Sequence, residues 1–193
     1  MDEQTSEWEW VRGLVPRLKE GLGTIALPGG AASVGDGVKL PYTSEIHAYS
    51  EDGVTKPRSS RYETDLLISD ATSDGTWIPR VVIECKLADV TTHDALSYSA
   101  KVTTHKHVHP YLRYGFLAGK LTAIPARLVK HGTYFDFMAT WPSGRPSDTE
   151  WNSFITLLAE EVHASRTLRG LLTNNRSPTQ QKYHLLRRTL LLS

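Results

Sequence analysis

The segment 62–87 constrains the fold of this chain more than any other part of its sequence. Two short apolar runs rich in β-branched residues, 66–68 and 81–83, lie on either side of residues 69–75, in which Ser, Asp and Gly predominate. Apolar runs separated by turn-forming residues are typical of a β-hairpin. We therefore predict two neighbouring antiparallel strands in this segment.

Charged residues interrupt both predicted strands. Asp65 begins the first apolar run, and Glu84 and Lys86 stand two residues apart in the second. Since side chains alternate between the faces of a strand, Glu84 and Lys86 share one face and Cys85 points to the other. One explanation of these charges is purely structural. Asp65 would be a surface acid at a strand edge, and Glu84 and Lys86 would form a solvated ion pair worth less than about 1 kcal/mol. We favour a functional site, because residues 81–83 have the composition of a central buried strand, in which a solvated pair would be out of place.

The residue types on this hairpin suit hydrolysis of a phosphodiester bond. That reaction requires a positioned water and neutralisation of the charge that develops on the phosphoryl oxygens. The carboxylates of Asp65 and Glu84 are hard oxygen ligands that suit Mg²⁺, and the backbone carbonyl of Cys85 is a candidate third ligand. Lys86 is placed to orient or deprotonate the attacking water, or to neutralise a phosphate oxygen. We therefore predict a metal-dependent phosphodiesterase site.

An Asp in an apolar strand, about twenty residues before a Val-Val-Ile-Glu-Xaa-Lys strand, resembles the motif of the PD-(D/E)XK nuclease superfamily. Asp65 matches the first acid, Glu84 the second and Lys86 the lysine, while Thr64 stands where the name of the motif has Pro. The resemblance implies an α/β fold with a restriction endonuclease-like αβββαβ core, in which helices flank a central mixed β-sheet. It also implies cleavage of nucleic acid with Mg²⁺, or Mn²⁺ as a substitute. In size the chain is similar to type II restriction endonucleases.

Many members of that superfamily use a further acid from the first helix. Glu7 is our first candidate, because it shares a helical face with apolar residues at i+4, i+7 and i+11. A plain alternative is that Glu7 favours the helix dipole from the first turn. Glu45 is the second candidate.

Composition narrows the class of protein. With 193 residues, 39% hydrophobic and 22% charged, the chain can form one globular domain with a proper core. A single cysteine excludes an intrachain disulfide framework. We find no signal peptide and no apolar run near the length of about 20 residues that a membrane span needs, so we expect a cytoplasmic protein. The glycines of residues 29–53 are not followed by Gly-Lys-Ser/Thr, so we expect no nucleotide cofactor.

The charge is divided unevenly along the chain. Residues 1–100 hold 9 Lys/Arg and 16 Asp/Glu, whereas residues 101–193 hold 13 and 5. An acidic half that holds cations beside a basic half that holds an anion suits a nuclease, although chance segregation of surface charge explains the division equally well. The candidate contacts to nucleic acid are basic residues outside the hairpin motif, namely Arg58, Arg61, Lys101, His105, Lys106, Arg113, Arg187 and Arg188.

Capping and periodicity predict the other elements. Ser6 with Glu9, and Ser147 with Glu150, form capping boxes that begin two helices, the first of which is kinked or divided at Pro16. We expect loops over 23–61, interrupted by a short element at 44–49. After the hairpin we expect a helix over 92–107 capped by Thr92, and a third strand over 111–118. Short strands or a hairpin are expected at 125–129 and 133–140, and a last helix from Ser177. Residues 1–193 thus form one nuclease domain, with a core of about 1–140 and a basic helical C-terminal arm of about 147–193.

The predicted function is that of a Mg²⁺-dependent endonuclease for double-stranded DNA, most similar to a type II restriction enzyme. A double-strand cutter needs two active sites, so we expect a homodimer. Two alternatives stay open, namely a Holliday junction resolvase or repair-type structure-specific nuclease, and a non-catalytic DNA-binding protein on a nuclease-like scaffold. His93, His105, His107 and His109 suggest a zinc site only weakly, because no second ligand cluster accompanies them.

Overall fold

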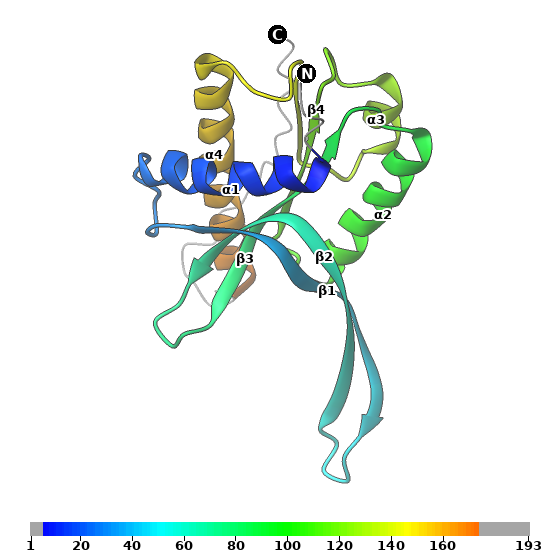
Figure 1. Cartoon of the computed structure of the whole chain (residues 1–193). Coiled ribbons are helices and arrows are strands. Elements are labelled where there is room, and N and C mark those ends of the chain that lie inside the picture. The colour runs from blue at the N-terminus through cyan, green and yellow to red at the C-terminus, as the bar shows by residue number, and fades with distance from the viewer. Residues whose placement is uncertain (1–5, 174–193) are drawn as a thin grey trace, which may run out of the picture.

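The structure is a computed structural model that describes residues 6–173. Along the chain its elements are α1 (Glu7–Gly23), β1 (Ser33–Tyr49), β2 (Thr55–Ala71), β3 (Trp77–Leu87), α2 (Thr92–Val108), β4 (Arg113–Gly119), α3 (Ala126–His131), β5 (Phe137–Trp141) and α4 (Asp148–Thr173). The strands form one sheet in the order β1-β2-β3-β4-β5, antiparallel from β1 to β3 and parallel from β3 to β5 (Figure 1). The predicted α/β class, with a mixed sheet flanked by helices and a helix at the C-terminal side, is confirmed.

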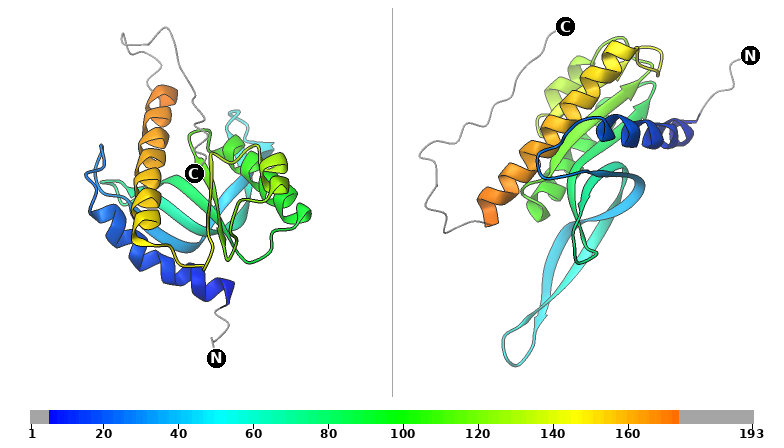
Figure 2. Two further views of the ribbon diagram at one scale, coloured as in Figure 1. Left: turned by 90° about the horizontal axis from the view of Figure 1, so that it is seen from above. Right: turned by 90° about the vertical axis from the view of Figure 1, so that its left-hand side faces the viewer.

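Helices cover both faces of the sheet. On one face, α1 and α4 pack against Val81, Ile83 and Cys85 of β3. On the other, Val82 of β3 and Tyr114, Phe116 and Ala118 of β4 pack against α2. In Figure 2 the sheet lies between these two groups of helices. Because β3 is covered on both sides, every residue from Val81 to Cys85 is at most 1% exposed.

The first helix is capped as predicted. Ser6 and Glu9 form the capping box, and the apolar stripe of α1 is buried. Pro16 lies inside one helix of 17 residues, so it does not divide the helix. Of the two tryptophans in this helix, Trp8 is 62% exposed and Trp10 is buried. Trp10 also donates a hydrogen bond of 2.7 Å from Nε1 to the carbonyl oxygen of Gly144.

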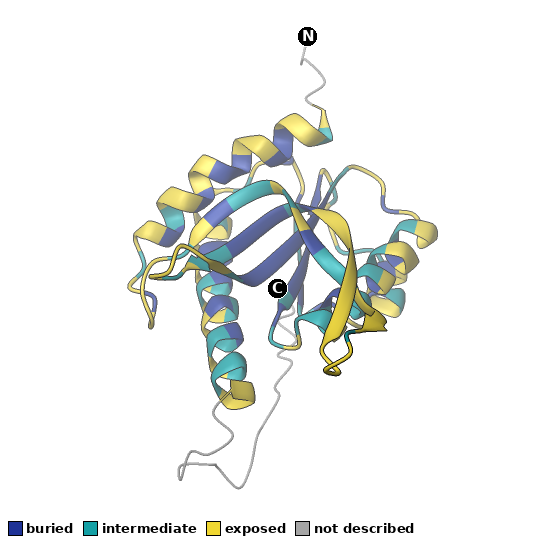
Figure 3. Ribbon diagram, turned by 90° about the horizontal axis from the view of Figure 1, so that it is seen from below, coloured by how far each residue is buried: buried dark blue, intermediate teal, exposed yellow. Residues whose placement is uncertain are grey.

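The largest difference from the prediction is in residues 23–61, which we expected to be loops. Residues 33–49 and 55–71 instead form two strands of 17 residues each, and their outer parts project from the body as a ribbon (Figure 1). Residues 44–49 and 55–63 of this ribbon are all exposed (Figure 3). A strand exposed on both faces needs no alternation of apolar and polar residues, so its sequence lacks the usual strand signal. We call residues 41–62 the arm.

Other boundaries differ by less. The cap of α2 is Thr91 rather than Thr92. Residues 126–131 form the short helix α3, where we expected a strand or hairpin, and β5 follows it. Ser147 and Glu150 make the predicted capping-box hydrogen bonds at the start of α4. The helix predicted from Ser177, with Arg187 and Arg188, lies outside the described residues. None of the described helices combines the length and apolar character needed to cross a membrane.

Candidate active site

Glu84 lies on the α2 side of β3 and is 1% exposed. Both of its carboxylate oxygens accept hydrogen bonds. The hydroxyl of Tyr114 donates to Oε1 at 2.7 Å, and Nζ of Lys101 donates to Oε2 at 3.0 Å. These contacts compensate the burial of the charge, which would be costly if the carboxylate were unpaired.

Asp65 stands on β2 beside this carboxylate. The backbone N–H of Cys85 donates a hydrogen bond of 2.7 Å to Asp65 Oδ2. Burial, and to a smaller degree the nearby charge of Glu84, raise the pKa of Asp65 to about 6, although the Cys85 hydrogen bond works in the opposite direction. Asp65 therefore lies beside a second carboxylate whose charge disfavours the ionisation of Asp65, which is an arrangement that a cation would relieve.

The strand next to Asp65 is distorted at a glycine. Asp36 pairs with Leu66 and Val38 pairs with Thr64, so Gly37 lies opposite Asp65 in the register of β1 and β2. Gly37 has φ +65, a left-handed conformation that costs glycine little and other residues more. The distortion lies at the base of the arm, where β2 passes from the body into the ribbon.

Glu7, the first residue of α1, reaches the end of β3. Its Oε2 accepts a hydrogen bond of 2.8 Å from the backbone N–H of Leu87 and lies 3.7 Å from Nζ of Lys86. The charge of Glu7 also contributes to the raised pKa of Asp65. The structure thus brings together Glu7, Asp65, Glu84 and Lys86, residues that are up to 79 positions apart in the sequence.

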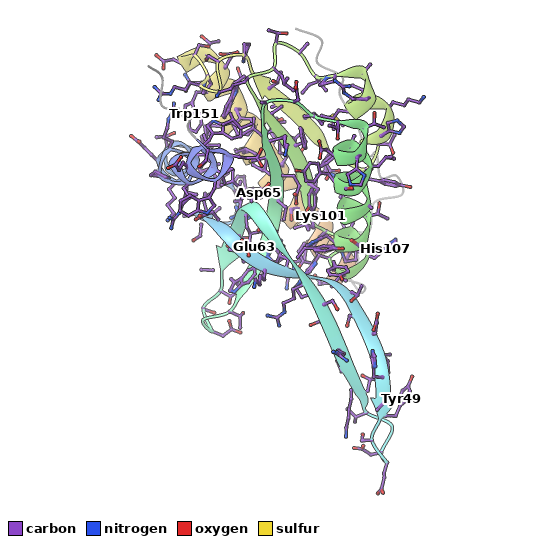
Figure 4. All side chains as sticks on the ribbon, turned by 45° about the vertical axis from the view of Figure 1, so that its right-hand side comes forward. Tyr49, Glu63, Asp65, Lys101, His107 and Trp151 are labelled. Carbon is purple, nitrogen blue, oxygen red and sulfur yellow. The ribbon has the colours of Figure 1, made fainter. Side chains whose placement is uncertain are left out.

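Glu45 does not join this group. It lies on the exposed arm opposite Arg58, with its carboxylate 2.8 Å from His47 Nε2. Arg58 precedes Asp65 by seven residues of β2, which is about 23 Å at a rise of about 3.3 Å per strand residue. The prediction of Glu45 as a ligand is corrected for this reason. Figure 4 shows the arm running from Asp65 at its base to Tyr49 near its tip.

The acids fit a metal that needs few protein ligands. Within residues 6–173, no three His, Cys, Asp or Glu side chains gather as a group able to hold an ion. Mg²⁺ is commonly bound by one or two carboxylates and keeps several waters, so Asp65, Glu84 and the Cys85 carbonyl suit it. The Cys85 thiol lies on the opposite face, where burial raises its pKa. The four histidines considered for zinc lie within or directly after α2, not on a strand.

Several predicted nucleic-acid contacts have other roles in the structure. His105 is 0% exposed, so its assignment as a contact is corrected. Lys106 and Arg113 pair with Asp136 at 2.8 and 3.1 Å, which makes them parts of a largely buried ionic network. Lys101 lies in the acidic site itself. Among the described candidates, Arg58 and Arg61 are exposed on the arm.

Two tyrosines of the site were not predicted as functional residues. Tyr114 donates to Glu84 from β4, and Tyr98 of α2 lies with its ring centroid 5.6 Å from Lys101 Nζ. The helical spacing of residues 98, 101 and 105 placed Tyr98 on the same face as Lys101, so that signal was present in the sequence. No local pattern connects Tyr114 with Glu84, because their contact depends on the parallel register of β3 and β4.

Comparison of the chain with models of known protein families, and with curated protein sequences, finds no match. The interpretation of the site therefore rests on its residues and their geometry.

Proposed function

We propose that this chain is a Mg²⁺-dependent DNA endonuclease with a restriction endonuclease-like core. The observation that carries the proposal is the gathering of Glu7, Asp65, Glu84 and Lys86 at one end of β3. The element order α1-β1-β2-β3-α2-β4 supports it, since this is the αβββαβ order that the motif implies.

Each residue has a definite task in this proposal. Asp65, Glu84 and the Cys85 carbonyl would hold Mg²⁺, which would supply charge neutralisation and an acidified water. Lys86 would orient the attacking water or neutralise a phosphate oxygen, and Glu7 restrains the ammonium group of Lys86 through the contact at 3.7 Å. Lys101 adds a second cation beside Glu84.

The proposed substrate is duplex DNA, cut by a homodimer that provides one active site per strand. A type II restriction enzyme and a branch-specific nuclease share this chemistry and differ in what they recognise. The long exposed arm is a specific reason to keep the second candidate, because recognition of a branched shape calls for surface far from the reacting phosphate.

The test is incubation of the full chain with plasmid, and separately with a synthetic four-way DNA junction, in Mg²⁺, Mn²⁺ or EDTA. Cutting should require the metal and should be lost in Lys86→Ala and Asp65→Asn, whereas the exposed helix residue Lys130→Ala should cut like the parent. Discrete plasmid fragments would identify a restriction enzyme, and cutting confined to the junction a branch-specific nuclease. Binding of DNA without cutting in either metal, or full activity of both site variants, would overturn the proposal.

A further inference from the structure

A column of three aromatic rings connects the interior with the base of the arm. The rings of Tyr42 and Tyr62 are stacked with centroids 3.8 Å apart and an interplanar angle of 13°. Tyr62 also stacks on His105, with centroids 6.0 Å apart at 27°. His105 is 0% exposed and Tyr62 is 37% exposed, so the column rises from the core to the surface.

The inner end of the column is an uncharged ring. Both ring nitrogens of His105 are buried and have no hydrogen-bond partner among residues 6–173. Burial lowers the pKa of His105 to about 4, so the imidazole is neutral at pH 7. His105 therefore acts as a flat packing surface beneath Tyr62.

A β-bulge places the outer ring. Pro41 pairs with Arg61 and Thr43 pairs with Ser60, so Tyr42 is an extra residue on β1. Bulges re-aim side chains and are enriched next to functional sites. Here the bulge directs Tyr42 onto Tyr62, and among the described residues no further ring stacks on Tyr42.

The column adjoins the acidic site on one side and basic residues on the other. Nζ of Lys101, which contacts Glu84, lies 5.5 Å from the ring centroid of Tyr62. The pairing of β1 with β2 is irregular at two places in the arm, and at both the extra residue is on β1. The side chains of β2 therefore alternate regularly between its two faces, which places Lys56 and Arg58 on the same face as Tyr62. Both cations are exposed, and neither forms an ion pair with a described residue.

We propose that the outer ring of Tyr42 is a stacking platform for an unpaired nucleobase of DNA, whose backbone follows Arg58 and Lys56 along the arm. Aromatic rings beside a line of cations are the pattern by which proteins hold single-stranded nucleic acid, since every base has a face that stacks. The inference rests on the proposed function and narrows its substrate class to duplex DNA that carries an unpaired, single-stranded segment next to the cut phosphate. It also explains why an exposed two-stranded ribbon projects from the body, since such a ribbon has little stability of its own.

Binding without cutting tests the platform directly. The full chain in EDTA is titrated into a fluorescently labelled single-stranded DNA of mixed sequence, and into the matching blunt duplex. Tyr42→Leu should weaken single-strand binding by roughly 5- to 100-fold, with a smaller effect on the duplex. Tyr42→Phe keeps the ring and should bind like the parent, and so should Tyr134→Leu, which removes an exposed tyrosine of another segment. A 2-aminopurine in the single strand should be quenched on binding to the parent and to Tyr42→Phe, but not to Tyr42→Leu.

The outcomes separate this inference from the proposed function. If Tyr42→Leu binds and quenches like the parent, or if its binding of both DNAs is weakened equally, the proposal of a stacking platform is wrong, even if the chain cuts plasmid. If single-strand binding depends on Tyr42 but neither metal supports cutting, the stacking platform is supported and the proposed nuclease function is wrong. Preference for single-stranded RNA of the same sequence would overturn the assignment to DNA. Thermal unfolding of each variant establishes that it is folded.

Discussion

The ammonium group of Lys101 and the hydroxyl of Tyr114 hold the carboxylate of Glu84 from two sides, at 3.0 and 2.7 Å. They come from α2 and β4, so the acid on β3 is fixed by its two neighbours in the fold. A carboxylate that is 1% exposed has lost its hydration, and these two donors compensate that loss.

Tyr114→Phe removes one donor and leaves an oxygen of Glu84 buried without its partner. We expect the free energy of unfolding, measured in urea, to fall by about 1.5–3 kcal/mol, the usual contribution of a hydrogen bond to a charged group. Tyr111→Phe is the matched control, because its hydroxyl makes no hydrogen bond to a described residue, and it should change stability by less than about 0.5 kcal/mol. Equal effects of the two variants would show that the Glu84 contact contributes nothing.

Substitution of Lys101 should mainly lower stability, whereas substitution of Lys86 should mainly abolish the proposed cutting. Lys101→Met leaves a buried carboxylate with one donor, so we expect a loss of about 1–3 kcal/mol in the free energy of unfolding. Lys86→Met breaks a longer contact of 3.7 Å to the half-exposed Glu7, so stability should change by less than about 0.5 kcal/mol. Under the proposed function, Lys86→Met should nevertheless abolish cutting. Urea unfolding and a plasmid assay on both variants measure the two effects, and a Lys86 variant that is unstable yet active would contradict the assignment.

Asp65→Asn should stabilise the protein while abolishing the proposed activity. The pKa of Asp65 is raised to about 6 in the folded chain from an ordinary value near 3.8. The folded state therefore holds more protons than the unfolded state between these values, and stability falls as pH rises through that window. Above about pH 6 the ionised Asp65 costs about 1–3 kcal/mol, which the amide avoids.

Thermal unfolding in EDTA checks this expectation. The Tm of Asp65→Asn should exceed that of the parent by about 2–10 °C at pH 7.5 and approach it near pH 4. Added Mg²⁺ should raise the Tm of the parent and leave that of the variant unchanged. A variant less stable than the parent at pH 7.5 would show that Asp65 is a structural acid.

The sequence indicated which charged residues lie together at the end of β3 better than it indicated what surrounds them. Asp65, Glu84 and Lys86 belong to a local pattern, in which alternation along a strand decides the face of each side chain. Glu7 could be predicted from the sequence, because helical spacing put it on the same face as the apolar residues of its helix. Tyr114 was not, since its contact depends on how two strands distant in sequence align.

The arm shows a different limit of sequence reasoning. Its strands are exposed on both faces, so no burial pattern marks them, and the glycines between residues 29 and 53 suggested loops. Conversely, Lys106 and Arg113 looked like surface cations, because their acidic partners lie 23 or more residues away in the sequence. Charges that are neutralised by distant partners cannot be told from free ones without the fold.

Arg166 provides a last prediction, away from the site. It joins α4 to the hairpin by donating to both oxygens of Asp70, and it also donates to the carbonyl oxygens of Pro28 and Gly30. Burial works to raise the pKa of Asp70, but the hydrogen bonds from Arg166 and Arg80 outweigh it and lower the pKa below its usual value. A lowered pKa means that this ionic group contributes stability above about pH 4 and loses it as the pH falls through the folded pKa.

Arg166→Met should therefore lower the free energy of unfolding by about 2–4 kcal/mol at pH 7, with a difference that narrows below pH 4. Arg127→Met, at an exposed position of α3 that has no ion pair to a described residue, is the control and should match the parent at every pH. Urea unfolding between pH 3 and pH 8 measures both. A loss for Arg166→Met that stays constant down to pH 3 would mean that the carbonyl contacts, and not the pairing with Asp70, hold α4 against the hairpin.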